Sequence, residues 1–281
     1  MESASYCTDL ASLRAWNCSR CGHTPGFVTE LAHFDAAWDL AGYAGWLPSL
    51  GAKVIVFKGT DSSSWSNWLN NMRTWRTDAR YPVPGAPKGL LIHSGFDVLW
   101  NSSSMAAAFL AAYATLHARH PRAPTYVAGH SMGAALAHLC ALDLRARFDP
   151  PELRVVTFGS PRVGNAAFAE FFDAHVAESW RFTHGRDIVP SLPPALMGFR
   201  HVSREVWVVD VDAPPGGGGG RRVGAGGGGG GGALSEERLI VCDDSGEDPT
   251  CHASVCHLGL CTSVADHLTY LGAPMMADGT C

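Results

Sequence analysis

The chain has 281 residues, enough for one large domain with a buried core and too few for two ordinary domains joined by a linker. Hydrophobic residues make up 46% and charged residues 17% of it, a composition typical of globular proteins and not of disordered ones. Because the net charge is -5 and no dense basic block occurs, we expect no nucleic-acid partner. No apolar run reaches the roughly 18 residues that a membrane-spanning helix needs.

The nine cysteines are grouped toward the two ends of the chain, with one exception. Cys140 stands alone in an apolar stretch, so the odd count predicts four disulfides and one buried free thiol. Zinc is the alternative, because Cys18-x-x-Cys21 and the cysteines and histidines of residues 251–261 have ligand-like spacings. The second group lacks a paired Cys-x-x-Cys, which favours disulfides and no metal.

Disulfides predict an oxidising compartment, so we expect a secreted protein or one in the lumen of the secretory pathway or vacuole. The first residues do not form a secretory signal, because Glu2 and Asp9 stand where basic charge and an apolar stretch are required. Either the protein stays inside the cell, or a targeting segment lies upstream of this sequence.

Short runs rich in β-branched residues alternate with longer helical stretches. The predicted strands are residues 52–57, 89–93, 125–128, 153–158, 180–183 and 205–211, and the predicted helices are residues 105–120, 132–148 and 165–175. This alternation predicts a single α/β domain over residues 1–281, with a mostly parallel central sheet and helices on both faces. The glycine-rich tract at about 213–234 has almost no side chains to bury, and we expect a disordered surface insertion without chemistry.

One pentapeptide suggests a nucleophile. Gly129-His130-Ser131-Met132-Gly133 lies between a predicted strand and a predicted helix. Glycines two positions before and after a serine allow the strained turn that lifts a serine hydroxyl out at the carboxyl edge of a sheet. We therefore predict Ser131 as a nucleophile, and we interpret His130 as a spacer that points elsewhere.

A nucleophilic serine needs a base and an acid that orients the base, and on this type of fold they follow in the order Ser, Asp or Glu, His. Asp187 comes just after the predicted strand 180–183, at a strand end suited to the orienting acid. Asp173 is interpreted as a solvated helix residue.

Four histidines follow Asp187 and are candidates for the base: His201, His252, His257 and His267. His267 has the best setting, a short segment with apolar flanks near the end of the chain. His252 and His257 neighbour cysteines, which favours loop positions held by disulfides.

Several ordered segments together match a known family. They are residues 54–60 (VIVFKGT), 67–68 (NW), 93–96 (HSGF), 129–133 (GHSMG), 157–165 (TFGSPRVGN), 187–194 (DIVPSLPP) and 266–267 (DH). On these segments, which span most of the chain, the sequence resembles the class 3 lipases, a group with fungal triacylglycerol lipases and feruloyl esterases. The chain departs from the family at Lys58, usually Arg, in a slightly longer loop after Thr60, and in the glycine tract.

The resemblance implies an α/β-hydrolase fold, a triad of Ser131, Asp187 and His267, and an oxyanion hole at Thr60 and Met132. Backbone amides at these two positions would donate to the negative oxygen of a tetrahedral intermediate. The resemblance also implies three disulfides and leaves a fourth pair by inference. The pairs are Cys7–Cys281, Cys18–Cys21 and Cys242–Cys251, and by inference Cys256–Cys261.

The expected function is a serine carboxylic-ester hydrolase, a lipase that cleaves fatty-acyl esters of glycerolipids such as triacylglycerol through an acyl-enzyme on Ser131. Alternatives are a feruloyl-type esterase, a phospholipase or galactolipase, and, from another class, a non-catalytic lipid-binding protein. We expect a monomer without cofactor, whose partner is an acyl lipid at a lipid–water interface.

A lid is expected in the segment after Thr60. Trp65, Trp68 and Leu69 belong to a stripe with helical spacing that continues through Met72. Such a stripe is more often a fixed core-facing surface, but the resemblance puts the lid at residues 67–68. These residues are therefore predicted to cover the pocket in water and to bind substrate at an interface.

Overall fold

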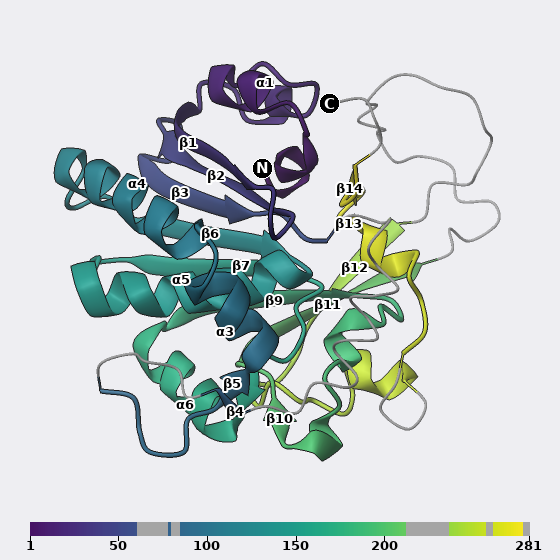
Figure 1. The fold of residues 1–281 in the computed structure, drawn as a ribbon. Coiled ribbons are helices and arrows are strands. Elements are labelled where there is room, and N and C mark those ends of the chain that lie inside the picture. The colour runs from purple at the N-terminus through teal and green to yellow at the C-terminus, as the bar shows by residue number, and fades with distance from the viewer. Residues whose placement is uncertain (61–77, 80–84, 212–235, 257–260, 278–281) are drawn as a thin grey trace, which may run out of the picture.

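The computed structural model describes residues 1–60, 78–79, 85–211, 236–256 and 261–277. Its centre is an eight-stranded sheet with the order β1-β2-β3-β6-β7-β9-β11-β12 (Figure 1). The strands are β1 (Val28–Asp35), β2 (Leu40–Leu47), β3 (Ala52–Phe57), β6 (Thr125–His130), β7 (Leu153–Phe158), β9 (Glu178–His184), β11 (Glu205–Val211) and β12 (Glu236–Val241). The five strands from β3 to β11 run parallel, and β1, β2 and β12 add antiparallel edges. The mostly parallel sheet of the sequence prediction is confirmed.

Helices cover one face of this sheet more fully than the other. They are α1 (Leu10–Ala15), α3 (Ser94–Asn101), α4 (Met105–Arg119), α5 (Met132–Phe148) and α6 (Ala166–His175), with a 3-10 turn, η1 (Glu2–Tyr6), at the start of the chain. Alternate residues of β3 point to opposite faces. Ile55 packs in the core beneath α4 and α5, and Val56 packs with Leu13 in the core beneath η1 and α1. Residues 1–15 therefore form the cover of the second face near β3 (Figure 1).

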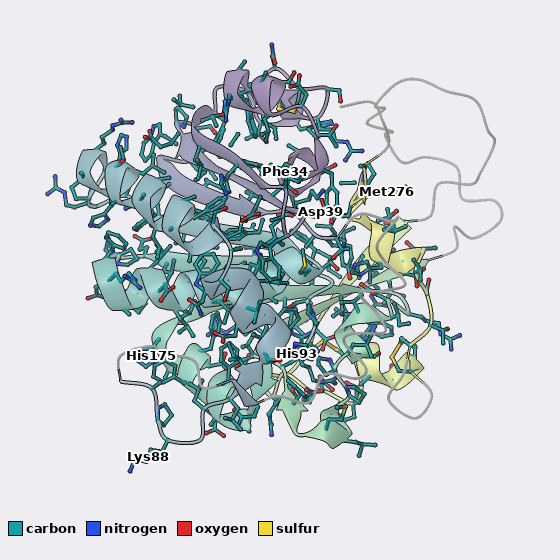
Figure 2. All side chains as sticks on the ribbon, in the orientation of Figure 1. Phe34, Asp39, Lys88, His93, His175 and Met276 are labelled. Carbon is teal, nitrogen blue, oxygen red and sulfur yellow. A yellow bond between two sulfur atoms is a disulfide. The ribbon has the colours of Figure 1, made fainter. Side chains whose placement is uncertain are left out.

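The predicted strand at residues 89–93 does not join the central sheet, which corrects the sequence prediction. Only Ile92–His93 is extended, and it forms β5 of a separate small sheet with β4 (Asp78–Ala79), β8 (Gly164–Asn165) and β10 (Phe199–Arg200). His93 ends this strand and caps the next helix, because its Nδ1 accepts from the amide of Gly95 at 3.1 Å (Figure 2). The chain turns into α3 at this point.

The rest of the described chain is made of short elements. They are η2 (Cys21–His23), η4 (Val189–Ser191), η5 (Ala195–Met197), η6 (His252–Val255), η7 (Asp266–Leu268) and the hairpin of β13 (Thr269–Tyr270) and β14 (Ala273–Pro274). Within the described residues, no helix has the length and apolar character needed to cross a membrane.

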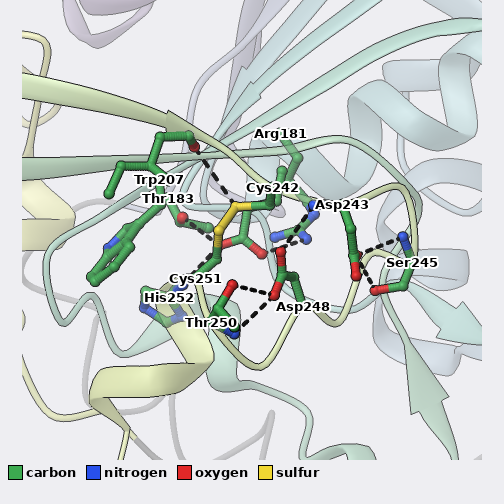
Figure 3. Close-up of a disulfide and its surroundings, with 12 residues drawn as sticks. Arg181, Thr183, Trp207, Cys242, Asp243, Ser245, Asp248, Thr250, Cys251 and His252 are labelled. Carbon is green, nitrogen blue, oxygen red and sulfur yellow. Dashed lines mark hydrogen bonds and ion pairs between the residues drawn. A yellow bond between two sulfur atoms is a disulfide. The ribbon is translucent and has the colours of Figure 1, made fainter.

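The described cysteines are arranged as the sequence analysis expected. Disulfides join Cys18 to Cys21, Cys242 to Cys251 and Cys256 to Cys261. Figure 3 shows the second of these beside Thr183, Arg181 and His252. Their sulfur atoms are bonded to one another, so none of them offers a thiolate to zinc.

The two remaining cysteines differ from each other. Cys7 is also disulfide-bonded, and its expected partner, Cys281, lies outside the described residues. Cys140 is a free thiol buried in α5.

Three other expectations fall outside the described residues: the lid residues Trp65, Trp68 and Leu69, the glycine-rich tract, and His257. The strands that flank the tract are neighbours, since Val211 at the end of β11 pairs with Glu236 at the start of β12.

Candidate active site

Ser131 occupies a strained turn between β6 and α5. Its backbone has φ 58° and ψ -126°, and its amide donates to the carbonyl of Phe158 at 2.9 Å. A Cβ at Gly129 would lie 2.2 Å from the carbonyl oxygen of Gly133, and one at Gly133 would lie 2.2 Å from that of Phe57. Because real Cβ atoms cannot approach so closely, the two glycines allow strand and helix to meet at the serine. Such strain at a serine is typical of a nucleophile elbow.

Asp187 follows β9 and is fully buried. Its Oδ1 accepts from the amide of Val189 at 2.8 Å, and His267 donates from Nδ1 to Oδ2 at 2.8 Å. The hydroxyl of Tyr270 also donates to Oδ2. These three donors hold the carboxylate in one orientation, and the carboxylate in turn fixes the ring of His267, as an acid that orients a base must.

The chain brings His267 to Asp187 through a short strand-like contact. Asp187 and Ser263 form a parallel bridge, in which Ile188 donates to the carbonyl of Ser263 at 3.1 Å. The next turn, η7, is held by His184, whose Nδ1 lies 3.0 Å from the carbonyl oxygen of Asp266 and 2.7 Å from that of Thr269. Two of the residues that flank His267 are therefore anchored to the end of β9.

Gly159 and its neighbour Phe158 contact both the serine and the Asp187–His267 pair. Phe158 holds the amide of Ser131, and a Cβ on Gly159 would lie 2.8 Å from both Nδ1 of His267 and Oδ2 of Asp187. All three predicted triad residues are 0% exposed, and Ser131 Oγ has no hydrogen-bond partner among the described residues. Hydrogen bonds between nucleophile and base are often long before substrate binds.

The two predicted oxyanion residues lie together beside the serine. The hydroxyl of Thr60 donates to Sδ of Met132 at 3.5 Å. The segment that leads to Thr60 also touches the nucleophile, because a Cβ on Gly59 would lie 2.9 Å from Cβ of Ser131. Thr60 and Met132 thus approach the serine from β3 and from α5.

His130 contradicts our interpretation that it points elsewhere. Its ring packs against that of His267, with centroids 4.3 Å apart, and its Nε2 donates to the carbonyl of His267 at 2.8 Å. Tyr6 hydrogen-bonds to the other ring nitrogen. The sequence carried a signal for His130, its position in the elbow, but none for Tyr6 or Tyr270, whose partners come from distant segments.

The other candidates for the base and for the orienting acid make contacts elsewhere. His201 donates from Nε2 to the carbonyl of Pro190 at 2.8 Å, and His252 donates to the backbone carbonyl of Asp187 at 2.9 Å. Asp173 is half-buried and accepts from Ser203, which corrects the prediction of a solvated residue.

Comparison with known proteins identifies the family of the chain. The family model for lipases of class 3 matches residues 54–197, which is half of the chain. The chain belongs to the class 3 lipase family.

Two of its relatives are fungal proteins. A lipase from Rhizomucor miehei is 30% identical over 97% of this chain and 66% of the relative. The secreted mono- and diacylglycerol lipase A of Penicillium camembertii is 34% identical over 71% of this chain and 62% of the relative. This chain therefore spans less than two thirds of the length of these relatives.

Solved structures match over nearly the whole chain. Lipase II from Rhizopus niveus has a TM-score of 0.79 and 25% identity over 98% of this chain and 92% of that one. A triacylglycerol lipase whose catalytic centre is described as a serine protease triad has a TM-score of 0.77 and 29% identity over 98% and 92%. These similarities establish the α/β-hydrolase fold that the sequence predicted.

Proposed function

We propose that the protein is a serine carboxylic-ester hydrolase that cleaves acyl esters of glycerolipids. The observation that carries the proposal is the buried Asp187–His267 pair beside a serine held in a strained elbow. This arrangement matches the roles of acid, base and nucleophile in acyl transfer.

In the proposed reaction, Ser131 Oγ attacks the acyl carbonyl while Nε2 of His267 takes the hydroxyl proton. Asp187 keeps the other proton on Nδ1 and stabilises the imidazolium that forms. The carbonyl oxygen becomes an anion, which the backbone amides of Thr60 and Met132 stabilise. His267 then protonates the leaving alcohol, and a water activated by the same ring releases the acid from acyl-Ser131.

The substrate class is supported by the relatives, which are named lipases and mono- and diacylglycerol lipases. Esters of glycerol with fatty acids are therefore the first choice, and triacylglycerol is the specific substrate that we propose. Secretion is proposed from the disulfides and from relatives named as secreted.

A substrate panel tests both reaction and substrate class. Initial rates would be measured on emulsified triacylglycerol and diacylglycerol, on phospholipid, on galactolipid, on a feruloyl ester and on a soluble short-chain ester. We expect the glycerides to be hydrolysed fastest. A higher rate on the feruloyl ester or on a polar lipid would contradict the proposed substrate class but not the proposed ester hydrolysis.

The chemistry itself is tested by Ser131→Ala, with Ser179→Ala as the matched control because Ser179 is also buried. The first variant is expected to lose at least about 10⁴-fold in kcat and to resist labelling by an organophosphonate. The control is expected to keep full activity and labelling. Equal activity in both variants would exclude Ser131 as the nucleophile.

A further inference from the structure

Tyr6 lies at the end of η1, is 1% exposed, and is far in sequence from the nucleophile elbow. Its hydroxyl takes part in two hydrogen bonds of opposite kind. The amide of Gly59 donates to Oη at 3.1 Å, and the hydroxyl hydrogen-bonds to Nδ1 of His130. A Cβ on Gly59 would lie 2.4 Å from this oxygen, so the glycine is what admits the tyrosine.

The positions of the protons follow from the partners. The carbonyl of His267 can only accept, so Nε2 of His130 carries a proton. Burial, with a smaller contribution from His267, holds the pKa of His130 well below its usual range, so the ring is neutral and Nδ1 accepts. The hydroxyl of Tyr6 then donates to Nδ1, and its oxygen accepts from Gly59.

The result is a single chain of three hydrogen bonds: Gly59 to Tyr6, Tyr6 to His130, and His130 to the backbone of His267. One end of the chain is the residue before Thr60, the proposed oxyanion donor. The other end is the proposed general base. This row of hydrogen bonds includes His130, the residue directly before Ser131 in the sequence.

The turn that carries Tyr6 is itself tied to both sides of the site. η1 packs on β3 and β6, the strands that lead to Thr60 and Ser131. The hydroxyl of Ser3 donates to the carbonyl of Pro274 in β14 at 2.6 Å, and Tyr6 packs with Tyr270 and Met275. The hydroxyl of Tyr6 therefore has a fixed position and can fix the positions of Gly59 and His130 through its hydrogen bonds.

We infer that Tyr6 and His130 are positioning residues that hold the oxyanion loop and the general base at a fixed separation across Ser131. This inference rests on the proposed hydrolase function and adds two residues to it. The ring of His130 also packs against that of His267, which becomes positively charged during the proposed acyl transfer. His130 is neutral and fully hydrogen-bonded in one tautomer, so the proton taken by His267 stays on His267.

The first test is Tyr6→Phe, which removes only the hydroxyl. The matched control is Tyr113→Phe, because Tyr113 is equally buried and its hydroxyl bonds to Thr125 at 2.9 Å in a part of the core that has no hydrogen bond to the site. For Tyr6→Phe we expect kcat to fall by about 10- to 100-fold with KM nearly unchanged, since a misplaced oxyanion donor acts on the transition state. The rate of phosphonylation of Ser131 should fall in parallel.

Thermal unfolding separates positioning from general damage. Both tyrosine variants should lose a similar few degrees in Tm, but only Tyr6→Phe should lose kcat. Equal kcat in Tyr6→Phe, Tyr113→Phe and the parent protein would overturn the inference and leave the hydrolase function intact. Unaltered activity of Ser131→Ala would instead remove the function on which the inference rests.

Two changes at His130 test the chain without touching Tyr6. A glutamine amide reaches the place of Nε2 and can donate to His267, whereas an asparagine reaches only the place of Nδ1 and can accept from Tyr6. Each substitution keeps one link and breaks the other, so His130→Gln and His130→Asn should both lower kcat. The double variant Tyr6→Phe/His130→Gln should be no slower than His130→Gln by more than about twofold, because His130→Gln already breaks the Tyr6–His130 link, after which the Gly59–Tyr6 bond no longer connects the oxyanion loop to the base. Multiplying losses would show that the two residues act independently and would overturn the inference.

Discussion

Two groups of buried polar side chains lie beside the same central strands and differ in how they are bonded. The site group lies at the carboxyl ends of the strands and is centred on Asp187. This carboxylate accepts hydrogen bonds from Val189, His267 and Tyr270. The helix-side group consists of His138 on α5, Thr157 on β7 and Ser179 on β9. The hydroxyls of Thr157 and Ser179 have no hydrogen-bond partner among the described residues.

The difference separates polar residues that organise chemistry from polar residues that reduce stability. A buried polar atom without a partner keeps the cost of leaving water and gains nothing in return, typically about 1–3 kcal/mol. At Asp187 that cost is offset by hydrogen bonds, which also fix the geometry. The helix-side group should therefore tolerate replacement by apolar residues, whereas the site group should not.

The largest expected effect is on activity, from Asp187→Asn in the site group. The amide can donate where the carboxylate only accepts, so His267 is expected to adopt the wrong tautomer and kcat to fall by about 10⁴-fold. Steady-state rates on the best glyceride measure it, with unfolding by urea to verify folding. Asp173→Asn is the control, since Asp173 is half-buried and accepts hydrogen bonds from Ser203 instead. A loss of less than about tenfold in Asp187→Asn would show that this carboxylate does not orient the base.

The next effect is on stability, from Glu205→Gln behind the site group. Glu205 receives hydrogen bonds from Arg181 at 3.2 Å and from Thr183 at 2.7 Å, and the Arg181 and Glu205 side chains are 1% and 6% exposed. Removing one charge leaves the other buried without its counter-ion, which typically costs about 3–5 kcal/mol in the free energy of unfolding.

A surface ion pair provides the control for this experiment. Glu152 pairs with Arg154 at 3.0 Å, and its side chain is 56% exposed. Glu152→Gln should change the free energy of unfolding by at most about 1 kcal/mol. Similar small losses for both variants would mean that the Arg181 charge finds another partner or water.

The site could be predicted from the sequence where its signals are local. Ser131 stands between glycines that only a strained turn requires, and Asp187 and His267 follow it in the order that the fold dictates. Tyr6 and Tyr270 could not be predicted, because their partners lie 124 and 83 positions away and a hydroxyl has no pattern of its own. His130 was misinterpreted because sequence does not say which way a ring turns beside the nucleophile.

The fold divides in the same way. The central strands and helix 132–148 have strong local patterns and were predicted. The hairpin of β1 and β2 was missed because β1 lies at the edge of the sheet, where residues such as Glu30 and His33 interrupt the alternation. Residues 89–93 have a strand-like composition, but most of them do not pair with a neighbouring strand. Contacts with β4 and β8 determine that only Ile92 and His93 do so.

A pH-dependent effect of intermediate size is expected from His138 in the helix-side group. Burial, with a contribution from the charge of Arg181, lowers the pKa of His138 to about 3, whereas the unfolded chain has the ordinary value near 6.5. Between these values the unfolded state binds a proton and the folded state does not, so stability falls as the pH is lowered through this range. At pH 5 the loss from this residue is about 2 kcal/mol.

The variant His138→Leu isolates that contribution, because the other buried histidines titrate alike in both proteins and cancel. Urea unfolding should show the variant to be more stable than the parent at pH 8. The difference in the free energy of unfolding should be larger by about 2 kcal/mol at pH 5. Parallel stability curves from pH 8 to pH 5 would mean that His138 is protonated in the folded protein. Activity should be unchanged, which distinguishes this histidine from His130.

The smallest expected effect comes from Thr157→Val, which tests whether the helix-side group is unbonded. Thr157 lies in β7, 0% exposed, and its hydroxyl has no partner among the described residues. Valine keeps the branched shape that suits a strand and removes only the polar atom, so the free energy of unfolding should stay level or rise by up to about 1 kcal/mol. Ser160→Ala is the contrast, because the hydroxyl of Ser160, also buried, donates to the carbonyl of Pro161 at 3.0 Å and its loss should destabilise. If Thr157→Val proves as destabilising as Ser160→Ala, the hydroxyl has a partner such as a buried water, and the two polar groups differ less than their direct contacts indicate.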